Sequence, residues 1–120
     1  MAASTISVGQ QGEQAARHFL EQRGYKFLAA NWRCKLGEVD LIMQDGDTRV
    51  MVEVRTRRPT TFGEGADTVA WQKKGKLIRA AKFYQQKENY WGDLRFDVVS
   101  ILLDTDPSLQ IEHITDAFSS

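Results

Sequence analysis

The sequence has little that would tie it to a disulfide scaffold, a membrane or a bulk electrostatic partner. Cys34 is the single cysteine among 120 residues, so no disulfide can form within the chain, which suits a reducing compartment. The 16 basic and 16 acidic side chains give a formal net charge of zero, so nucleic-acid binding would need a local patch. No apolar run is long enough to span a bilayer. We therefore expect a cytoplasmic protein with no membrane partner.

The N-terminal residues, the histidines and the composition further limit the class of protein. Residues 1–8 have neither a basic start nor an apolar block, which predicts a disordered terminus and no signal peptide. His18 has no second His or Cys at ligand spacing, so we expect it on the surface rather than at a metal. Hydrophobic content of 42% and charged content of 27% are ordinary for a globular protein, and the length predicts a single domain, residues 1–120.

The chain is organised around residues 37–57. Apolar runs at 39–43 and 50–54, bounded by turn residues, predict two strands. Asp45-Gly46 lies between them, and this dipeptide is a strong signal for a hairpin turn. With these two residues as the turn, Gln44 pairs with Asp47, and the residue numbers in every opposed pair add up to 91.

This register predicts a group of charged side chains on one face of the hairpin. Asp40 lies opposite Met51 with Glu53 as its diagonal neighbour, and residues two apart share a face, so Arg55 joins them. Two close carboxylates repel unless a cation lies between them, and a hard divalent cation with oxygen ligands is a natural candidate. The alternative is a solvated face on which Arg55 or Arg57 pairs the acids across the strand.

The remaining pattern predicts further helices and strands, and together an α/β domain. Near-continuous apolarity over residues 94–103 is typical of a central strand covered on both faces, and Asp97 within it is expected to pair with a nearby Arg. Outside the central hairpin we expect two helices, over 9–23 and 67–89, and three strands, over 25–32, 94–103 and 109–114.

The long helix carries a dense set of cations with no acid among them. They are Lys73, Lys74, Lys76, Arg79 and Lys82. In a chain of zero net charge, this stretch leaves the remainder acidic. It is either a solvated face or a surface for phosphate contact without sequence reading.

The ordered motifs resemble the YraN family of small bacterial proteins. They are Gly12-Glu13, Asn31-Trp32-Arg33, Gly37-Glu38-Val39-Asp40-Leu41-Ile42, Val52-Glu53-Val54-Arg55-Thr56-Arg57, Lys73 and Arg95-Phe96-Asp97-Val98-Val99. The resemblance implies a restriction-endonuclease-like core, in which a mixed central β-sheet is flanked by α-helices. It also implies a distant similarity to archaeal Holliday-junction resolvases.

By this resemblance the chain is expected to be a metal-dependent DNA endonuclease. Asp40 and Glu53 would hold Mg²⁺ or Mn²⁺, and Glu13 would complete the shell; otherwise Glu13 simply favours the dipole of its helix. DNA, including branched DNA, is the expected partner, and a homodimer is left open. The residues expected to contact DNA are Lys73, Lys76, Arg79 and Arg57.

Arg55 is where the chain departs from the family pattern. The family places Lys two residues after the Glu, whereas this chain has Arg55 after Glu53. Arg stays protonated and is bulkier than Lys, so it cannot exchange a proton at neutral pH. We therefore expect weak nuclease activity or none. The alternative is a non-catalytic nucleic-acid-binding or protein-interaction module that keeps the nuclease fold.

Overall fold

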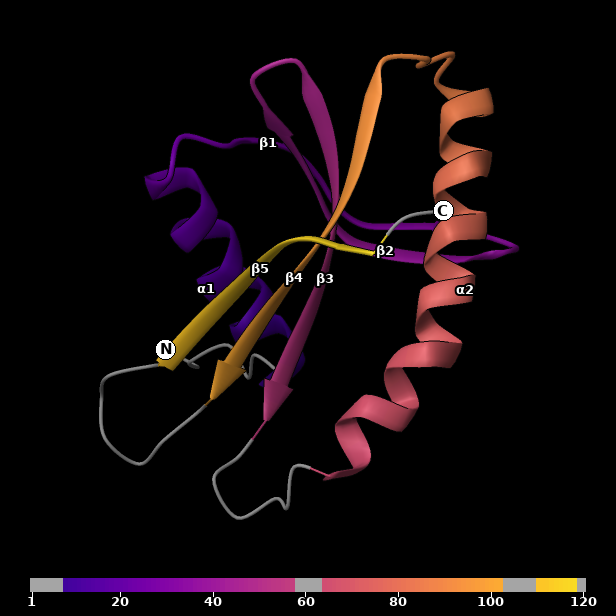
Figure 1. The fold of residues 1–120 in the computed structure, drawn as a ribbon. Coiled ribbons are helices and arrows are strands. Elements are labelled where there is room, and N and C mark those ends of the chain that lie inside the picture. The colour runs from indigo at the N-terminus through magenta and orange to yellow at the C-terminus, as the bar shows by residue number, and fades with distance from the viewer. Residues whose placement is uncertain (1–7, 58–63, 103–109, 119–120) are drawn as a thin grey trace, which may run out of the picture.

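A computed structural model describes residues 8–57, 64–102 and 110–118, and their side chains at 9–56, 74–102 and 110–118. Within these ranges the chain forms two helices and five strands (Figure 1). In chain order they are α1 (Val8–Gln22), β1 (Lys26–Cys34), β2 (Gly37–Asp45), β3 (Thr48–Arg57), α2 (Glu64–Lys87), β4 (Asp93–Leu102) and β5 (Gln110–Phe118).

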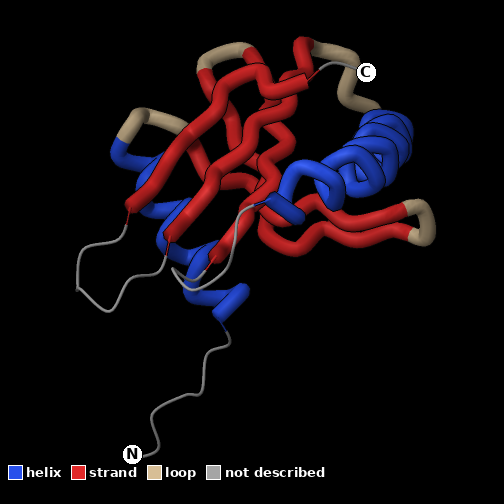
Figure 2. Tube along the Cα trace, turned by 60° about the horizontal axis from the view of Figure 1, so that its bottom comes forward, coloured by secondary structure: helices blue, strands red, loops and turns tan. Residues whose placement is uncertain are grey.

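The five strands form one mixed sheet in the order β1-β2-β3-β4-β5. β3 and β4 are parallel, whereas the other three neighbouring pairs are antiparallel. Parallel neighbours need a crossover connection, and α2 provides it. The two helices lie on opposite sides of the sheet (Figures 1 and 2). The expected α/β architecture, a mixed central sheet flanked by helices, is confirmed at this level.

Each side of the sheet has its own apolar core. The buried cluster under α1 consists of Ala16, Leu20, Tyr25, Leu41, Met43, Val50, Val52, Val99 and Ile101. The buried cluster under α2 consists of Val39, Ile42, Met51, Leu77, Ala80, Ala81, Tyr84 and Phe96. β4 contributes to both clusters, so the prediction that it is a central strand covered on both faces is confirmed.

The predicted elements are all present, with ends that differ by a few residues. Residues 1–7 and 58–63 lie outside the described part of the chain. The expectation of a disordered terminus over residues 1–8 therefore falls outside it as well, except at Val8, which belongs to α1. Neither helix in the described ranges is long and apolar enough to cross a membrane.

The register of the central hairpin differs from the prediction. Asp45 pairs with Thr48, so the turn is Gly46-Asp47 and paired numbers sum to 93 rather than 91. Gly46 has a φ of 60°, whereas Asp45 is not among the residues with positive φ. Two-residue turns whose twist matches that of the strands are favoured in hairpins, and in one such type only the first position needs positive φ, which glycine adopts readily. The predicted pairings were therefore wrong by two residues.

Asp97 is the centre of a buried polar network on the α1 side. Arg95 donates to it from Nε (2.9 Å to Oδ1) and from a terminal nitrogen (3.1 Å to Oδ2), which confirms the predicted pairing with Arg. His113 Nε2 lies 2.8 Å from Oδ2, and the Asp116 amide donates to Oδ1 at 3.0 Å. Burial alone would raise the pKa of Asp97, but these hydrogen bonds hold it below its ordinary value. The network joins β4 to β5.

Candidate functional site

Asp40 lies where β2 departs from regular strand geometry. Val39 belongs to the cluster under α2 and Leu41 to the cluster under α1, although residues two apart in a regular strand share a face. The recorded pairing of β2 with β3 ends at Leu41 and Val52. Beyond it, Asp40 Oδ2 accepts a hydrogen bond of 2.9 Å from the Val54 amide. A side-chain carboxylate thus takes the place of a backbone carbonyl between the two strands.

The environment of Asp40 is strongly acidic. Burial is the largest cause that raises the pKa of this carboxyl to about 6, and the carboxylates of Glu53, Glu13 and Glu38 raise it further. The hydrogen bond from the Val54 amide acts in the opposite direction but does not offset them. Four acids from α1, β2 and β3 therefore interact at one place, and a cation bound there would relieve their repulsion.

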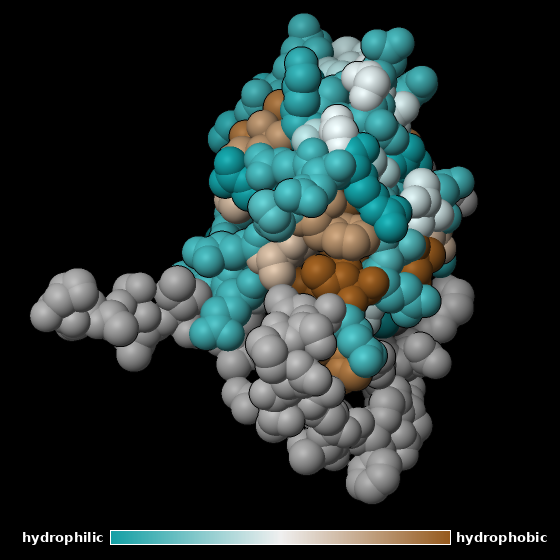
Figure 3. All heavy atoms as spheres, turned by 90° about the vertical axis from the view of Figure 1, so that its left-hand side faces the viewer, coloured by the Kyte–Doolittle hydropathy of each residue, from teal (hydrophilic) through white to brown (hydrophobic). Residues whose placement is uncertain are grey.

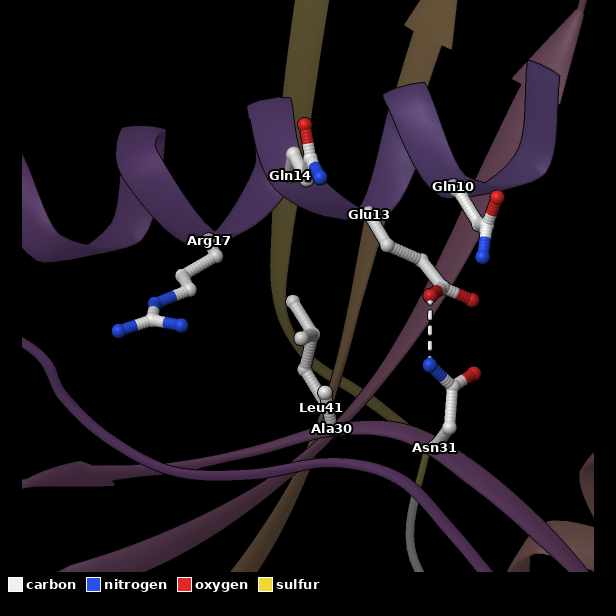
Figure 4. A pocket seen from close by; sticks show the side chains of 7 residues that line it. All are labelled: Gln10, Glu13, Gln14, Arg17, Ala30, Asn31 and Leu41. Carbon is white, nitrogen blue, oxygen red and sulfur yellow. Dashed lines mark hydrogen bonds between the residues drawn. The ribbon is translucent and has the colours of Figure 1, made fainter. Parts of the chain in front are cut away.

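Glu13 is brought to this place by a close contact between α1 and β3. A Cβ atom at Gly12 would clash with Oγ1 of Thr56, so a larger residue would require the Thr56 side chain to move. The neighbouring Glu13 reaches toward the strands, and its Oε1 accepts a hydrogen bond of 3.0 Å from Asn31 Nδ2 (Figure 4). The prediction that Glu13 lies near Asp40 agrees with its effect on the pKa of Asp40.

Asn31 is a site residue that sequence reasoning missed. It lies between the pairs Ala30–Leu41 and Trp32–Val39, so it faces Asp40 across the β1–β2 ladder. Its φ of 52° falls in the left-handed region, where Asn is enriched among non-glycine residues. Two features of the sequence could have drawn attention to Asn31. Asn tolerates this conformation, and Asn31 lies in a motif that resembles the family's, but neither feature indicates a contact with Glu13.

Glu53 and Arg55 lie on the α2 side of β3, by alternation with Met51 in the cluster under α2. Glu53 is 9% exposed, and Arg55 Nε lies 4.0 Å from Glu53 Oε2. At this distance the two side chains form an ion pair, but the atoms are too far apart for a hydrogen bond. Glu53 and Arg55 thus share a face as predicted, whereas the regular alternation on which the prediction for Asp40 rested does not hold at that residue.

Glu13 and Glu53 each raise the pKa of Asp40, but Glu13 comes from α1 and Glu53 lies on the α2 side, and the three acids do not form a preassembled shell. Among the described residues, no group of three or more His, Cys, Asp or Glu side chains is placed to hold a metal ion. Glu13 is turned toward Asn31 instead. The chemistry of the donors still fits a hard divalent cation, because carboxylate oxygens are its preferred ligands. Among the described residues, the hydrogen bond to Asp40 is the one that its Oδ2 accepts from the Val54 amide.

Of the four residues predicted to contact DNA, two have described side chains. Lys76 and Arg79 are exposed on α2, whereas the side chains of Lys73 and Arg57 lie outside the described part of the structure. The carbonyl of Lys76 would be 2.9 Å from a Cβ at Gly37, so the glycine lets the β1–β2 turn pack against α2. The two described cations are therefore carried by a helix in close contact with the hairpin that holds Asp40.

A cavity of about 280 Å³ lies between α1 and the β1–β2 hairpin. Figure 4 shows Glu13, Gln10 and Arg17 reaching from α1 toward the strands, whereas Gln14 points away. The side of the molecule on the left of Figure 1, where α1 lies, is mostly hydrophilic around a smaller apolar area (Figure 3). The residues that line the cavity are Gln10, Glu13, Gln14, Arg17, Ala30, Asn31 and Leu41.

These features define a small α/β protein with an acidic site between the second and third strands of a mixed sheet. The profile of the family described as "Uncharacterised protein family UPF0102" matches residues 12–101, three quarters of the chain. The chain belongs to this family, which is the YraN family, so the resemblance in the sequence motifs is confirmed.

Relatives in several bacteria match the chain over most of their length. A UPF0102 protein of Rhodococcus opacus is 38% identical over 117 residues, which cover 97% of this chain and 99% of the relative. One of Ectopseudomonas mendocina is 41% identical, covering 98% and 99% respectively. A third, of Pseudomonas putida, is 46% identical over 102 residues and covers 83% of each chain.

Proposed function

We propose that this protein is a metal-dependent DNA endonuclease built on a restriction-endonuclease-like core. The observation that supports this most is the placement of Asp40. Its carboxylate is fixed by the Val54 amide between β2 and β3, and Glu13 and Glu53 are close enough to raise its pKa. An acid held in place beside other carboxylates is suited to a divalent cation, although Arg33 lies 3.4 Å from Glu38 and Arg55 lies 4.0 Å from Glu53.

Each side chain of the site has a defined task in this proposal. Asp40 and Glu53 bind Mg²⁺ or Mn²⁺, and Glu13 completes the shell after it leaves Asn31. When bound, the cation lowers the pKa of a water molecule and neutralises charge on the phosphate. The Val54 amide fixes the orientation of Asp40. Arg55 stabilises negative charge on the phosphate beside Glu53, but it takes no proton because its guanidinium stays charged.

The cations of α2 hold the DNA backbone. Lys76 and Arg79 are exposed, and residues 74–87 include five cations and no acid. Contacts of this type bind phosphates without reading the base sequence, and they give an affinity that falls steeply with salt. Lys73 and Arg57 belong to the same surface in this proposal. The substrate class is DNA of irregular shape, including branched DNA, rather than one base sequence.

A second function is favoured by one observation, the presence of Arg55. If the residue two positions after Glu53 must exchange a proton, Arg55 cannot do so, and the site cannot catalyse hydrolysis at neutral pH. The protein would then be a non-catalytic module that binds nucleic acid or another protein. Both functions use the same fold, so they differ in whether Asp40 is needed for chemistry.

The test is cleavage of linear, flapped and four-way-branched DNA in Mg²⁺ and in Mn²⁺. Wild type is compared with Asp40→Asn, Arg55→Lys and the double variant. Asp47→Asn is a matched control, because it makes the same change in the same hairpin at the exposed turn. We expect cleavage that requires Asp40, is unaffected by the control and increases in Arg55→Lys. Inactivity of both wild type and Arg55→Lys on every DNA form, without metal binding, would favour the non-catalytic module.

A further inference from the structure

We infer that the cavity between α1 and the β1–β2 hairpin binds one unstacked nucleobase of the DNA strand held at the acidic site. This inference rests on the proposed function and names a feature that its substrate must have. The cavity is next to the site because Leu41 directly follows Asp40, and Asn31 faces Asp40 across the strands. A nucleotide bound at Asp40 can therefore place its base against Asn31.

The size and lining of the cavity suit a single ring system. At about 280 Å³ it is just below the range of roughly 300–1,000 Å³ that is usual for larger ligands. Leu41 and Ala30 provide an apolar floor on the strands, and polar side chains of α1 form the opposite wall (Figure 4). An apolar floor with a few polar groups at its rim is the usual way in which a flat, partly polar ring is bound.

The polar groups favour a base that carries an exocyclic amino group. Asn31 Oδ1 accepts no hydrogen bond from the described residues, so it can accept from an amine, and in the metal-free protein the carboxylate of Glu13 beside it is a second acceptor. Acidic side chains accept from the amino group of cytosine, and Asn pairs with adenine through an acceptor and a donor. Thymine has no amino group and is expected to bind least well.

Arg17 supplies a surface for stacking at one end of the cavity. Its guanidinium carbon lies 3.6 Å from the centre of the Phe27 ring, and its Nε lies 3.2 Å from Glu21 Oε2. These two contacts favour a fixed orientation of the guanidinium plane. Arg planes stack on exposed bases in single-stranded nucleic acid, and such stacking tolerates many sequences.

The consequence is a restriction on substrate shape. A base inside a duplex cannot enter the cavity unless it leaves its stack and its partner, which costs a few kcal/mol. An unpaired base at a flap, loop or branch point enters without that cost. The cavity therefore directs the site toward DNA with unpaired nucleotides beside the phosphate that is attacked.

The direct test is a titration of the metal-free protein with mononucleotides, followed by NMR of its amide groups. The ligands are dAMP, dCMP, dGMP and dTMP, with deoxyribose 5-phosphate as the probe without a base. We expect shifts of the Asn31 side-chain amide and of the Ala30 and Leu41 backbone amides with the first three ligands. Smaller shifts are expected with dTMP, and none with the sugar phosphate. Equal shifts with the sugar phosphate, or no shifts with any base, would overturn the inference.

Two variants make the test specific to the cavity. Ala30→Leu places bulk on its floor and should weaken dCMP binding about tenfold or more, as expected for loss of one base contact. Asn31→Gly removes the amide and keeps the backbone conformation, because glycine accepts a φ of 52° without strain. Thr115→Leu is the control, because it makes an exposed strand residue larger at the opposite edge of the sheet. Unchanged dCMP binding in Ala30→Leu, confirmed as folded by its spectrum, would contradict the inference.

The outcomes separate this inference from the proposed function. Base-dependent shifts in a protein that cleaves no DNA would support the cavity and reject the nuclease. The opposite result has three parts: cleavage depends on Asp40, the mononucleotides cause no base-dependent shifts, and Ala30→Leu cuts flapped DNA as fast as wild type. That result would support the nuclease and reject base binding in the cavity.

Discussion

Asp40→Asn should make the metal-free protein more stable above neutral pH. The carboxyl of Asp40 is half-buried beside other acids, and its pKa is raised from 3.8 to about 6. Its ionised form is therefore unfavourable in the folded protein. Asn carries no charge, and its side-chain oxygen can still accept the hydrogen bond that the Val54 amide donates to Asp40 Oδ2. The substitution removes the unfavourable charge and keeps the favourable contact.

The magnitude follows from the shift in pKa. A rise of about 2 units corresponds to about 3 kcal/mol at 1.36 kcal/mol per unit. Because the folded carboxyl binds its proton more tightly than the unfolded one, the folded state carries more protons between about pH 4 and pH 6. The unfolding free energy of wild type therefore falls as pH rises through that window. Above it, the full difference of up to about 3 kcal/mol favours the variant, and below about pH 4 the difference vanishes.

The assay is urea unfolding of wild type and Asp40→Asn with a chelator present, at pH 4, 5, 6 and 8. Asp47→Asn is the control and should stay within about 0.5 kcal/mol of wild type at each pH. Addition of Mn²⁺ should then stabilise wild type by mass action and leave Asp40→Asn nearly unchanged. A variant that is less stable than wild type at pH 8, or a difference that does not depend on pH, would refute the reasoning.

Three further predictions concern neighbouring parts of the molecule. Arg55→Lys should bind Mn²⁺ more tightly in a metal titration, because a smaller ammonium leaves room near Glu53; unchanged affinity would speak against crowding by Arg55. Lys76→Glu and Arg79→Glu should weaken binding to unrelated DNA sequences similarly and lower the salt slope by about one unit per phosphate contact, measured by fluorescence anisotropy. Equal losses in the control Lys26→Glu, at an exposed lysine of β1, would point to a general charge effect. Asp97→Asn should lower the unfolding free energy by about 3 kcal/mol at pH 7, because Arg95 loses a buried partner; since the pKa of Asp97 is lowered, this loss should shrink below about pH 4, and a loss independent of pH would contradict it.

The elements of the fold could be predicted from the sequence because their signals are local. Apolar periodicity and glycine positions indicate each helix and strand. The hairpin register could not, because Asp45-Gly46 and Gly46-Asp47 are both acceptable turns on composition. The choice depends on which residue takes positive φ, and the structure places Gly46 at the first turn position. A shift of two in the sum of paired numbers keeps the same faces along the regular part of the hairpin, but it does not account for Asp40, where the alternation breaks.

The break around Asp40 could not be predicted because it involves three segments at once. Asn31 takes a left-handed conformation in β1, Asp40 leaves regular alternation in β2, and the Val54 amide of β3 bonds to the Asp40 side chain. Each of these residues is compatible with an ordinary strand when taken alone. The hydrogen bond from Asn31 to Glu13 adds a fourth segment, 18 residues away along the chain. Sequence motifs marked these positions without giving the contacts between them.

Asp40, which is half-buried, and Asp97, which is fully buried, have pKa values that move in opposite directions. Asp97 is fully buried, and Arg95, His113 and the Asp116 amide all stabilise its charge, so its pKa is lowered. Asp40 has one amide donor and several acidic neighbours, so its pKa is raised. A protein has no structural reason to keep an acid whose charge destabilises the fold, whereas a site for a cation requires one. The pH dependence of Asp40→Asn measures what the charge of Asp40 costs the metal-free protein in stability.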